Sequence, residues 1–474
     1  MFERRDVWEL SEENPWHPVL EWYAKGITAM QRRDGTTFSD PTSWRYLAAI
    51  HGTSVPRSRW PRGATWNECQ HSSWFFLPWH RIFLHYFERV VRQAVVDQGG
   101  PADWALPYWD YSDSRRRNVR SLPPAFRAPR MPSGDPNPLF VRERDRDVNG
   151  GAELEPEMVD TRAALRETDF TGPVGSRLPG FGGPATGFSH GGGPVGSLEG
   201  TPHGDVHVGV GGFQPPGFMS SFETAGRDPI FWLHHANIDR LWEVWLRQGG
   251  RRANPTDSRW LDMRFRIGGG RLAVTLTVRE VLDTAQPPLT YRYSNAGAPP
   301  FLLEAAEEEE AVPKDLFPEM VGASEHRVSL TSTPTHVELA IDQPSGPLAM
   351  GAEAEEPVQP SKVYLKVENV KGTELAAPTY LVYVNLPPGA NPAEHEDRRA
   401  GQVSMFGVAE ASEGNEEHSG SGLTFSFDIT DVAKRLQEAG DWDPENLRVT
   451  FTPLRAGGAQ GGDVSAGRVS LFYA

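Results

Sequence analysis

The chain has 474 residues, of which 38% are hydrophobic and 10% aromatic, so it is long enough for two or three domains with a sizeable core. Its formal net charge of −16 argues against nucleic acid and anionic membrane surfaces as partners. No apolar run of about 18 residues or more occurs, so we expect no transmembrane helix.

The N-terminal segment carries Arg4 and Arg5 without an apolar stretch behind them, so it does not resemble a secretory or twin-arginine signal. The single cysteine cannot form an intrachain disulfide, which fits a reducing compartment. We therefore expect a cytoplasmic protein, unless a partner protein exports it. The sequence does not determine the oligomeric state.

Helical hydrophobic patterns occur in the first 300 residues, over 18–33, 41–51, 79–97 and 226–247. The segments between them are irregular, and one of them, 171–200, is rich in glycine. The 48 glycines and 41 prolines predict long loops rather than disorder, because aromatic residues are plentiful. We therefore predict a mainly α domain over residues 1–300.

An acidic run over residues 304–310 is typical of a solvated linker, which we place at 301–325. Beyond the linker, hydrophobic residues alternate as they do in strands, over 363–370, 379–385, 423–429 and 447–454. Turn signals rich in proline and glycine separate these segments. We predict a β-sandwich-like domain over residues 326–474.

Six histidines fall into two triplets. In the second triplet, His203 and His207 are four residues apart, so a helix would place both imidazoles on one face. His235 lies on a later amphipathic helix, and Asp239, one turn further on, is well placed to accept the free N–H of a ligand imidazole. The spacing resembles the HExxH motif of zinc proteases, but Gly204 replaces its general base.

The first triplet is His51, His71 and His80. His51 ends a helical pattern and is followed by Gly52, a good C-terminal cap. Pro78 can lie in the first turn of the helix that carries His80, which leaves His71 on the preceding loop. The three side chains therefore come from a helix end, a loop and a helix start.

Three imidazoles suit copper, zinc, iron or nickel, whereas structural zinc sites usually use thiolates. A chain with one cysteine cannot build a thiolate site. Two triplets of neutral imidazoles therefore predict a binuclear site that binds dioxygen rather than a structural clamp.

At these residues the chain resembles the type 3 copper proteins, which are the tyrosinases, catechol oxidases and haemocyanins. The copper A signature of that family resembles His71-x8-His80-Arg81. The copper B signature resembles His203-x3-His207 followed by Asp228-Pro229-x-Phe231-x3-His235-x-Asn237-x-Asp239. The resemblance implies a four-helix bundle around two copper ions, with dioxygen as co-substrate.

The resemblance assigns His51, His71 and His80 to one copper and His203, His207 and His235 to the other. It leaves His234 beside the second copper, with Phe231, Asn237 and Asp239 around the ligands. The remaining histidines, His85 and His190 among them, have no partner at ligand spacing, and we interpret them as packed or surface residues.

The likeness extends to residues 106–111, to 289–293, which resemble the tyrosine motif of plant polyphenol oxidases, and to 363–385, which resemble their C-terminal domain. Cys69 stands two residues before His71, as in fungal relatives where that cysteine forms a thioether to the histidine ring. The alternative is a small buried thiol. This combination of plant-like motifs with a cysteine placed as in fungal relatives resembles a bacterial, plant-like polyphenol oxidase.

Two further residues take roles from the resemblance. Glu199 matches the glutamate that holds a water near copper in plant relatives, and its alternative is an exposed loop carboxylate. Efficient tyrosinases often have Asn at the position of Gly204, so we expect weak hydroxylation of monophenols. Phe222 matches the bulky gate residue of catechol oxidases and favours small, flat catechols; its alternative is ordinary core packing.

The expected function is oxidation of o-diphenols to o-quinones by dioxygen, with ortho-hydroxylation of monophenols as a weaker activity. The expected partners are small phenolic substrates. The alternative from another class is a haemocyanin-like dioxygen carrier that uses the same six ligands. If the C-terminal domain covers the copper site, the full chain is a latent enzyme.

Overall fold

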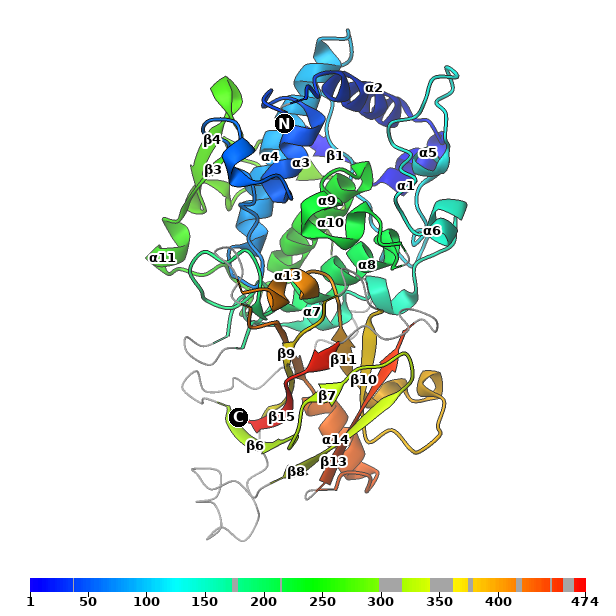
Figure 1. The fold of residues 1–474 in the computed structure, drawn as a ribbon, viewed down its shortest axis with the longest axis vertical. Helices are drawn as coiled ribbons and strands as arrows, with labels where there is room; N and C mark the ends of the chain where they lie inside the picture. The colour runs from blue at the N-terminus through cyan, green and yellow to red at the C-terminus, as the bar shows by residue number, and fades with distance from the viewer. Residues whose placement is uncertain are drawn as a thin grey trace.

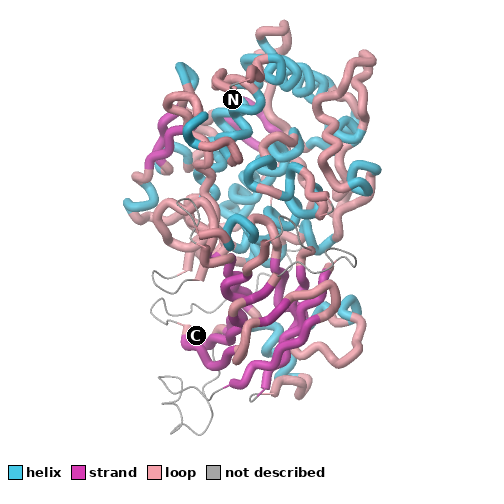
Figure 2. The backbone as a smooth tube through the Cα atoms, in the orientation of Figure 1, coloured by secondary structure: helices cyan, strands magenta, loops and turns pink. Residues whose placement is uncertain are grey.

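The structure, a computed structural model, describes residues 1–36, 38–172, 178–213, 215–297, 318–341, 361–373, 378–414, 420–443, 446–454 and 464–474. Most helices lie in residues 1–297, here called the N-terminal part, and most strands in residues 318–474, the C-terminal part. The two parts are stacked along the long axis of the molecule (Figures 1 and 2).

Four long helices match the predicted helical patterns to within about three residues. They are α2 (Pro18–Arg32), α3 (Trp44–His51), α4 (Phe76–Val96) and α10 (Pro229–Arg247). Helix α4 packs against α2 and α10, and α2 also contacts α3. The bundle arrangement of the four helices stays a prediction.

The starts of these helices follow from local chemistry. The side chains of Ser43 and Asp228 cap α3 and α10 by accepting backbone N–H groups of the first turn. Prolines occupy the first turns of α2 and α10, where their missing N–H costs nothing. Pro78 likewise lies in the first turn of α4, as predicted, so His71 remains on the preceding loop.

The C-terminal part is built on one hydrogen-bonded sheet of nine strands. In spatial order they are β11 (Arg399–Val403), β10 (Tyr380–Val384), β13 (Asn446–Pro453), β8 (Thr335–Ile341), β6 (Glu319–Ala323), β15 (Arg468–Tyr473), β9 (Val363–Val370), β12 (Leu423–Asp428) and β2 (Gly193–Pro194). Strand β11, at one edge, contacts β12 near the other edge, so the sheet is curled.

The prediction of strands at 363–370, 379–385, 423–429 and 447–454 is confirmed. The two-sheet sandwich stays a prediction, since the main sheet is continuous among the described residues. Residues 301–317 of the predicted linker lie outside the described residues. The predicted linker extends too far along the chain, because β6 (Glu319–Ala323) already belongs to the sheet.

The N-terminal part also contributes to the sheet. Strand β2 comes from the loop before the second histidine triplet and pairs in parallel with β12. A small apolar cluster, separate from the two larger hydrophobic cores, combines Val208 and Phe222 of the N-terminal part with Phe406 of the C-terminal part. The histidine triplets therefore lie close to where the two parts meet.

A buried charge network ties the N-terminus to the long helices. The Asp239 carboxylate on α10 accepts hydrogen bonds from Arg81 Nε at 2.5 Å and Arg4 Nη1 at 3.3 Å. It also accepts from the hydroxyls of Tyr291 and Tyr293, each at 2.5 Å. Burial alone would raise the pKa of the Asp239 carboxyl, but Arg81 and Arg4 lower it below its usual range.

These bonds fix β1 (Phe2–Arg4) and β5 (Tyr291–Tyr293), which pair in parallel, against α4 and α10. No described helix is both long enough and apolar enough to cross a membrane.

Replacing Asp239 by Ala should lower the free energy of unfolding by about 3–5 kcal/mol, because Arg4 and Arg81 would keep their buried charges without this partner. Urea denaturation of the full chain measures this change. Asp262 forms an exposed ion pair with Arg279, and its replacement by Ala should change the value by less than about 1 kcal/mol. Equal effects of the two substitutions would contradict the assigned role of the network.

Candidate metal centre

All six histidines of the two triplets are buried and lie in one cluster. His51 is the last residue of α3, His71 lies on the loop before α4, and His80 lies on α4. In the second triplet, His203 lies in the π-helical turn Glu199–Gly204, His207 on α8 (Asp205–Gly211) and His235 on α10.

The ring distances place all six histidines in one cluster, and the assignment of three rings to each metal stays a prediction, since His51, His80 and His235 also offer ligand atoms within 4.8 Å of one another. Ring centroids within the first triplet are 5.3–5.7 Å apart. Those within the second are 4.7–5.4 Å apart. The two triplets also touch, since the rings of His80 and His235 stack at 4.6 Å. Two metal ions held by these rings would be neighbours.

Backbone carbonyls orient four of the rings. In the first triplet, Nδ1 of His51 donates to the Phe222 carbonyl at 3.0 Å, and Nδ1 of His80 donates to the Phe76 carbonyl at 2.8 Å. In the second triplet, Nδ1 of His203 donates to the Glu199 carbonyl at 3.0 Å, and Nδ1 of His207 donates to the Met219 carbonyl at 2.8 Å. A carbonyl only accepts, so each Nδ1 carries the proton and each Nε2 keeps a lone pair. This is the usual arrangement of imidazoles that bind a metal through Nε2.

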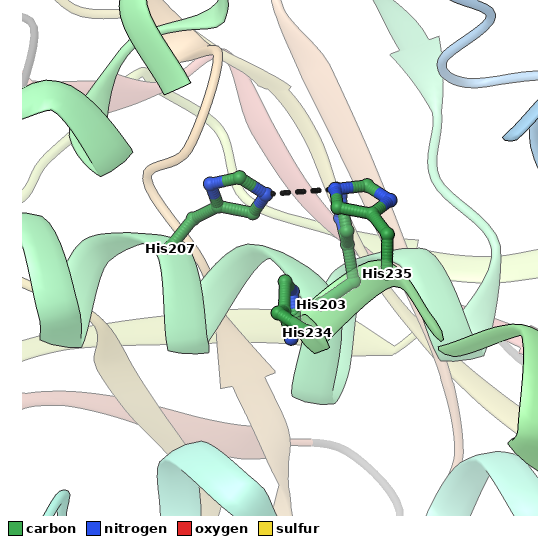
Figure 3. Close-up of side chains that lie close together, drawn as sticks. All are labelled: His203, His207, His234 and His235. Atoms are coloured by element: carbon green, nitrogen blue, oxygen red, sulfur yellow. Dashed lines mark hydrogen bonds between the residues drawn. The ribbon is translucent and has the colours of Figure 1, made fainter. Parts of the chain in front are cut away.

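The Nε2 atoms of His51, His71, His80 and His203 are buried without a hydrogen-bond partner among the described residues. In the second triplet, Nε2 of His207 and His235 are only 3.2 Å apart, as the dashed line in Figure 3 shows. Buried nitrogen lone pairs without a partner are costly, and a bound metal ion would use these nitrogens as its ligands.

Burial lowers the pKa of all six imidazoles, to about 3 for His51. The rings are therefore neutral near pH 7, the form that binds metals.

His235 is not oriented as the sequence suggested. Its Nδ1 has no hydrogen-bond partner among the described residues, and Asp239 bonds to arginines and tyrosines instead. The prediction that Asp239 accepts the imidazole proton is therefore wrong. One turn of helix brings the two residues to the same side, but Arg81 and Arg4 compete for the carboxylate with full charges.

The ring of His234, the residue before His235, also packs against the other two rings of the second triplet. Its ring is 5.1 Å from that of His207 and stacks with His203 at 5.6 Å. His203, His207, His234 and His235 offer ligand atoms that all lie within 4.8 Å of one another (Figure 3). The family resemblance assigns His235 rather than His234 as the ligand, and that choice stays a prediction.

Phe231 and Asn237 flank the triplets on α10. The Phe231 ring lies 4.1 Å from the ring of His235 and 4.9 Å from that of His51, so it packs between the two groups. Asn237 accepts a hydrogen bond from Arg240 Nε at 2.9 Å. Both residues are buried and support the helix that carries His235.

Cys69 has a partner that the sequence did not indicate. Its Sγ lies 3.1 Å from Nδ1 of His190, and the Cys69 carbonyl accepts from the same nitrogen at 2.9 Å. His190, interpreted from the sequence as a packed or surface residue, is buried, and its contact with Cys69 is one that sequence spacing did not indicate. Sγ also lies within 4.8 Å of ligand atoms of His51 and His71, and the thioether to His71 stays a prediction.

Glu199 is buried rather than exposed. Both of its carboxylate oxygens accept from the backbone N–H of Ser72, at 2.8 and 3.0 Å. Burial raises the pKa of the Glu199 carboxyl to about 8. It lines a cavity of about 20 Å³ together with His71 and His203, which is room for one water molecule.

Two aromatic rings cover the triplets, and the sequence singled out only one of them. Phe222 stacks on His71, with centroids 4.2 Å apart and planes 10° from parallel. Phe406 of the C-terminal part stacks on His207 at 3.9 Å and 12°. Phe406 is remote from every metal motif in sequence, and only the packing of the two parts brings it to the site.

The carboxylate of Asp205 lies between the two parts. This residue stands between His203 and His207 in sequence and accepts from Thr379 Oγ1 at 2.7 Å and Gln402 Nε2 at 2.5 Å. Both donors belong to the C-terminal part, so hydrogen bonds as well as apolar contacts hold it to the second triplet.

Comparisons with known proteins identify related chains. A family model described as the common central domain of tyrosinase matches residues 41–248, and one described as a domain of unknown function matches residues 317–474. The tyrosinase HcTyr1 of Hahella sp. (strain CCB-MM4) is 36% identical over 99% of this chain and 98% of its own. A chloroplastic polyphenol oxidase of Malus domestica is 32% identical over 60% of this chain and 48% of its own.

Solved structures share the fold across both parts. A latent aurone synthase (polyphenol oxidase) has a TM-score of 0.64 at 21% identity and covers 99% of this chain and 89% of its own. Latent apple tyrosinase has a TM-score of 0.60 at 22% identity and covers 100% of this chain and 97% of its own. The arrangement of helices and sheet is therefore one that these proteins have in common.

Loss of a single ring should remove one metal from the protein. We expect the wild-type chain to bind two copper ions, and the His203→Ala and His80→Ala variants to bind about one each, because each triplet loses a ligand. Metal analysis after gel filtration measures the ratio. His85→Ala, a buried histidine outside both triplets, is the matched control and should still bind two.

Proposed function

Because the chain belongs to the tyrosinase and polyphenol oxidase family of copper oxidoreductases, we propose that it oxidises o-diphenols to o-quinones with dioxygen at two copper ions. The observation that carries the proposal is the convergence of six neutral, buried imidazoles in two adjoining triplets. Two bound copper ions supply the binding of dioxygen and the uptake of two electrons from the diphenol.

The residues of the chain itself determine orientation and access. His51, His71 and His80 would hold one copper, and His203, His207 and His235 the other. The backbone carbonyls on Nδ1 fix the ring directions before the metal binds, which reduces the reorganisation that binding requires. The surrounding aromatic side chains exclude water from the centre.

Glu199 is suited to handle the proton of a bound phenol. Its carboxyl lines the small cavity beside His71 and His203, and the Ser72 N–H holds it in place. A phenol has a pKa near 10, so its deprotonation needs an acceptor as well as the metal. We propose that Glu199 holds one water in this cavity and receives the proton through it, acting as the carboxylate that prevails above its raised pKa of about 8.

Diphenols are the favoured substrates in this proposal. Gly204 has no side chain to bind the water, and a Cβ atom there would lie 2.6 Å from Ser404 Oγ. The Phe222 ring stacks flat on His71, so a substrate entering an opened site would pass this ring, which favours thin, unbranched rings. Both features support oxidation of simple catechols over hydroxylation of tyrosine-like monophenols.

We also propose that the full chain is a latent enzyme. Phe406 stacks on His207 and lies 4.7 Å from Phe222, and the remaining cavity of about 20 Å³ is too small for a phenol. A substrate could reach the triplets only after residues 404–407 move. A dioxygen carrier, the alternative function, is not supported by the relatives, which are named as oxidases or tyrosinases.

Oxygen consumption with a simple catechol tests the proposed reaction. The copper-loaded full chain and its Phe406→Ala variant are compared, with quinone absorbance as the second signal. Oxygen uptake with matching quinone formation by either protein supports an oxidase. If both proteins carry two copper ions and neither consumes oxygen, the proposed function is wrong.

Phe406→Ala should raise the turnover of catechol by the full chain about tenfold or more. The substitution removes about 3 kcal/mol of packing from the covered arrangement and so increases the open population. Phe472→Ala, in the same part but on β15, is the control and should leave turnover unchanged. Equal turnover of wild type and Phe406→Ala would show that this ring does not limit access.

Glu199→Gln should lower turnover of phenols about 10²-fold or more with both copper ions retained, because the amide has nearly the same shape but cannot accept the proton. Steady-state kinetics together with metal analysis separates the two effects. Glu167→Gln serves as control, because Glu167 is a second carboxyl whose pKa is raised by burial but it accepts from Ser197 and does not line the cavity. Unchanged kinetics of Glu199→Gln would remove Glu199 from the mechanism.

A further inference from the structure

Phe222 makes two contacts with the first triplet. Its carbonyl oxygen accepts the Nδ1 proton of His51 at 3.0 Å, and its ring stacks on His71 at 4.2 Å. The peptide and the side chain of one residue therefore set the direction of two of the three expected ligands. Whatever fixes Phe222 also fixes those ligands.

A residue of the C-terminal part holds the Phe222 peptide. Oε1 of Glu410, on α13 (Val408–Ser412), accepts from the backbone N–H of Phe222 at 3.3 Å and from Ser221 Oγ at 3.1 Å. Two hydrogen bonds thus meet at the backbone of Phe222, whose N–H binds Glu410 and whose carbonyl oxygen binds His51. The bond to Glu410 crosses from one part of the molecule to the other.

Backbone segments pack closely against Phe222 on both sides, at Gly52 and at Gly407. A Cβ atom at Gly52 would lie 2.2 Å from the Phe222 carbonyl oxygen. A Cβ atom at Gly407 would lie 2.4 Å from the tip of the Phe222 ring, and Gly407 has a φ of +76°. Only glycine fits at these two positions, so Phe222 is confined between α3 and the turn that leads into α13.

Glu410 is not needed to cap the helix that begins at Phe222. Ser221 already caps α9 (Phe222–Ala225) by accepting the N–H of Glu223 at 3.3 Å. Burial raises the pKa of the Glu410 carboxyl, and the nearby Glu223 adds to the shift. A buried carboxyl is costly, and the hydrogen bonds of Oε1 to Ser221 and Phe222 offset part of that cost, since Oε2 has no partner among the described residues.

We propose that Glu410 is a positioning residue for the first copper triplet, acting on His51 by fixing the backbone of Phe222. The C-terminal part then does more than cover the site, because it also fixes the acceptor that orients a ligand. This inference rests on the proposed function, since it concerns the same copper ligands.

Release of copper from the full chain to an excess of chelator tests the proposal. In Glu410→Ala, one of the two copper ions should leave about tenfold faster than in wild type, because lost outer partners of metal ligands weaken binding by about 10–100-fold. Glu410→Gln should release copper as wild type does, because its amide oxygen can accept the same two hydrogen bonds. Glu413→Ala, an exposed carboxylate after the same helix, is the matched control.

Three results would overturn the proposal: wild-type release from Glu410→Ala, equal acceleration of both copper ions, or release from Glu410→Gln as fast as from Glu410→Ala. If Glu410→Ala does not fold, Glu410→Asp carries the same expectation, since its shorter side chain withdraws the carboxylate from the Phe222 N–H. A wild-type chain that cannot hold two copper ions would contradict the proposed function instead.

Discussion

The structure depends on one arrangement: backbone carbonyls hold the Nδ1 protons of buried imidazoles and leave the Nε2 lone pairs facing a common centre. An imidazole buried in this way loses its hydration and is kept neutral. Six such rings would be a heavy cost to folding without a ligand. The first turns of α4 and α9, the 3-10 turn Phe218–Ser220 and the π-helical turn supply the carbonyls that meet four of the six rings.

Both parts of the chain contribute residues to the site. The N-terminal part supplies all six expected ligands, whereas the C-terminal part supplies Phe406 over His207, donors to Asp205, and Glu410 at the Phe222 peptide. These contacts combine apolar stacking with buried hydrogen bonds. In our proposals, access to the centre and orientation of its ligands both depend on the same short segment, residues 404–410.

Sequence reasoning succeeded where the signal was local. Hydrophobic periodicity predicted the four long helices, Pro78 predicted the start of α4, and alternation predicted the strands of the curled sheet. Sequence reasoning failed where partners are distant in sequence. Asp239 lies one turn from His235 but bonds to Arg4 and Arg81, and His190 meets Cys69 across 121 positions. Neither pairing leaves a trace in spacing.

The sequence by itself determined the chemistry of the site, because metal ligation needs particular residue types at spacings that helices and turns impose. The two histidine triplets, Glu199 and Phe222 could all be identified from such spacings and the family motifs they resemble. Only the tertiary structure decided what surrounds them. Phe406 and Glu410 reach the site because the sheet packs against the helices, and the sequence spacing of residues so far apart carries no information about that contact.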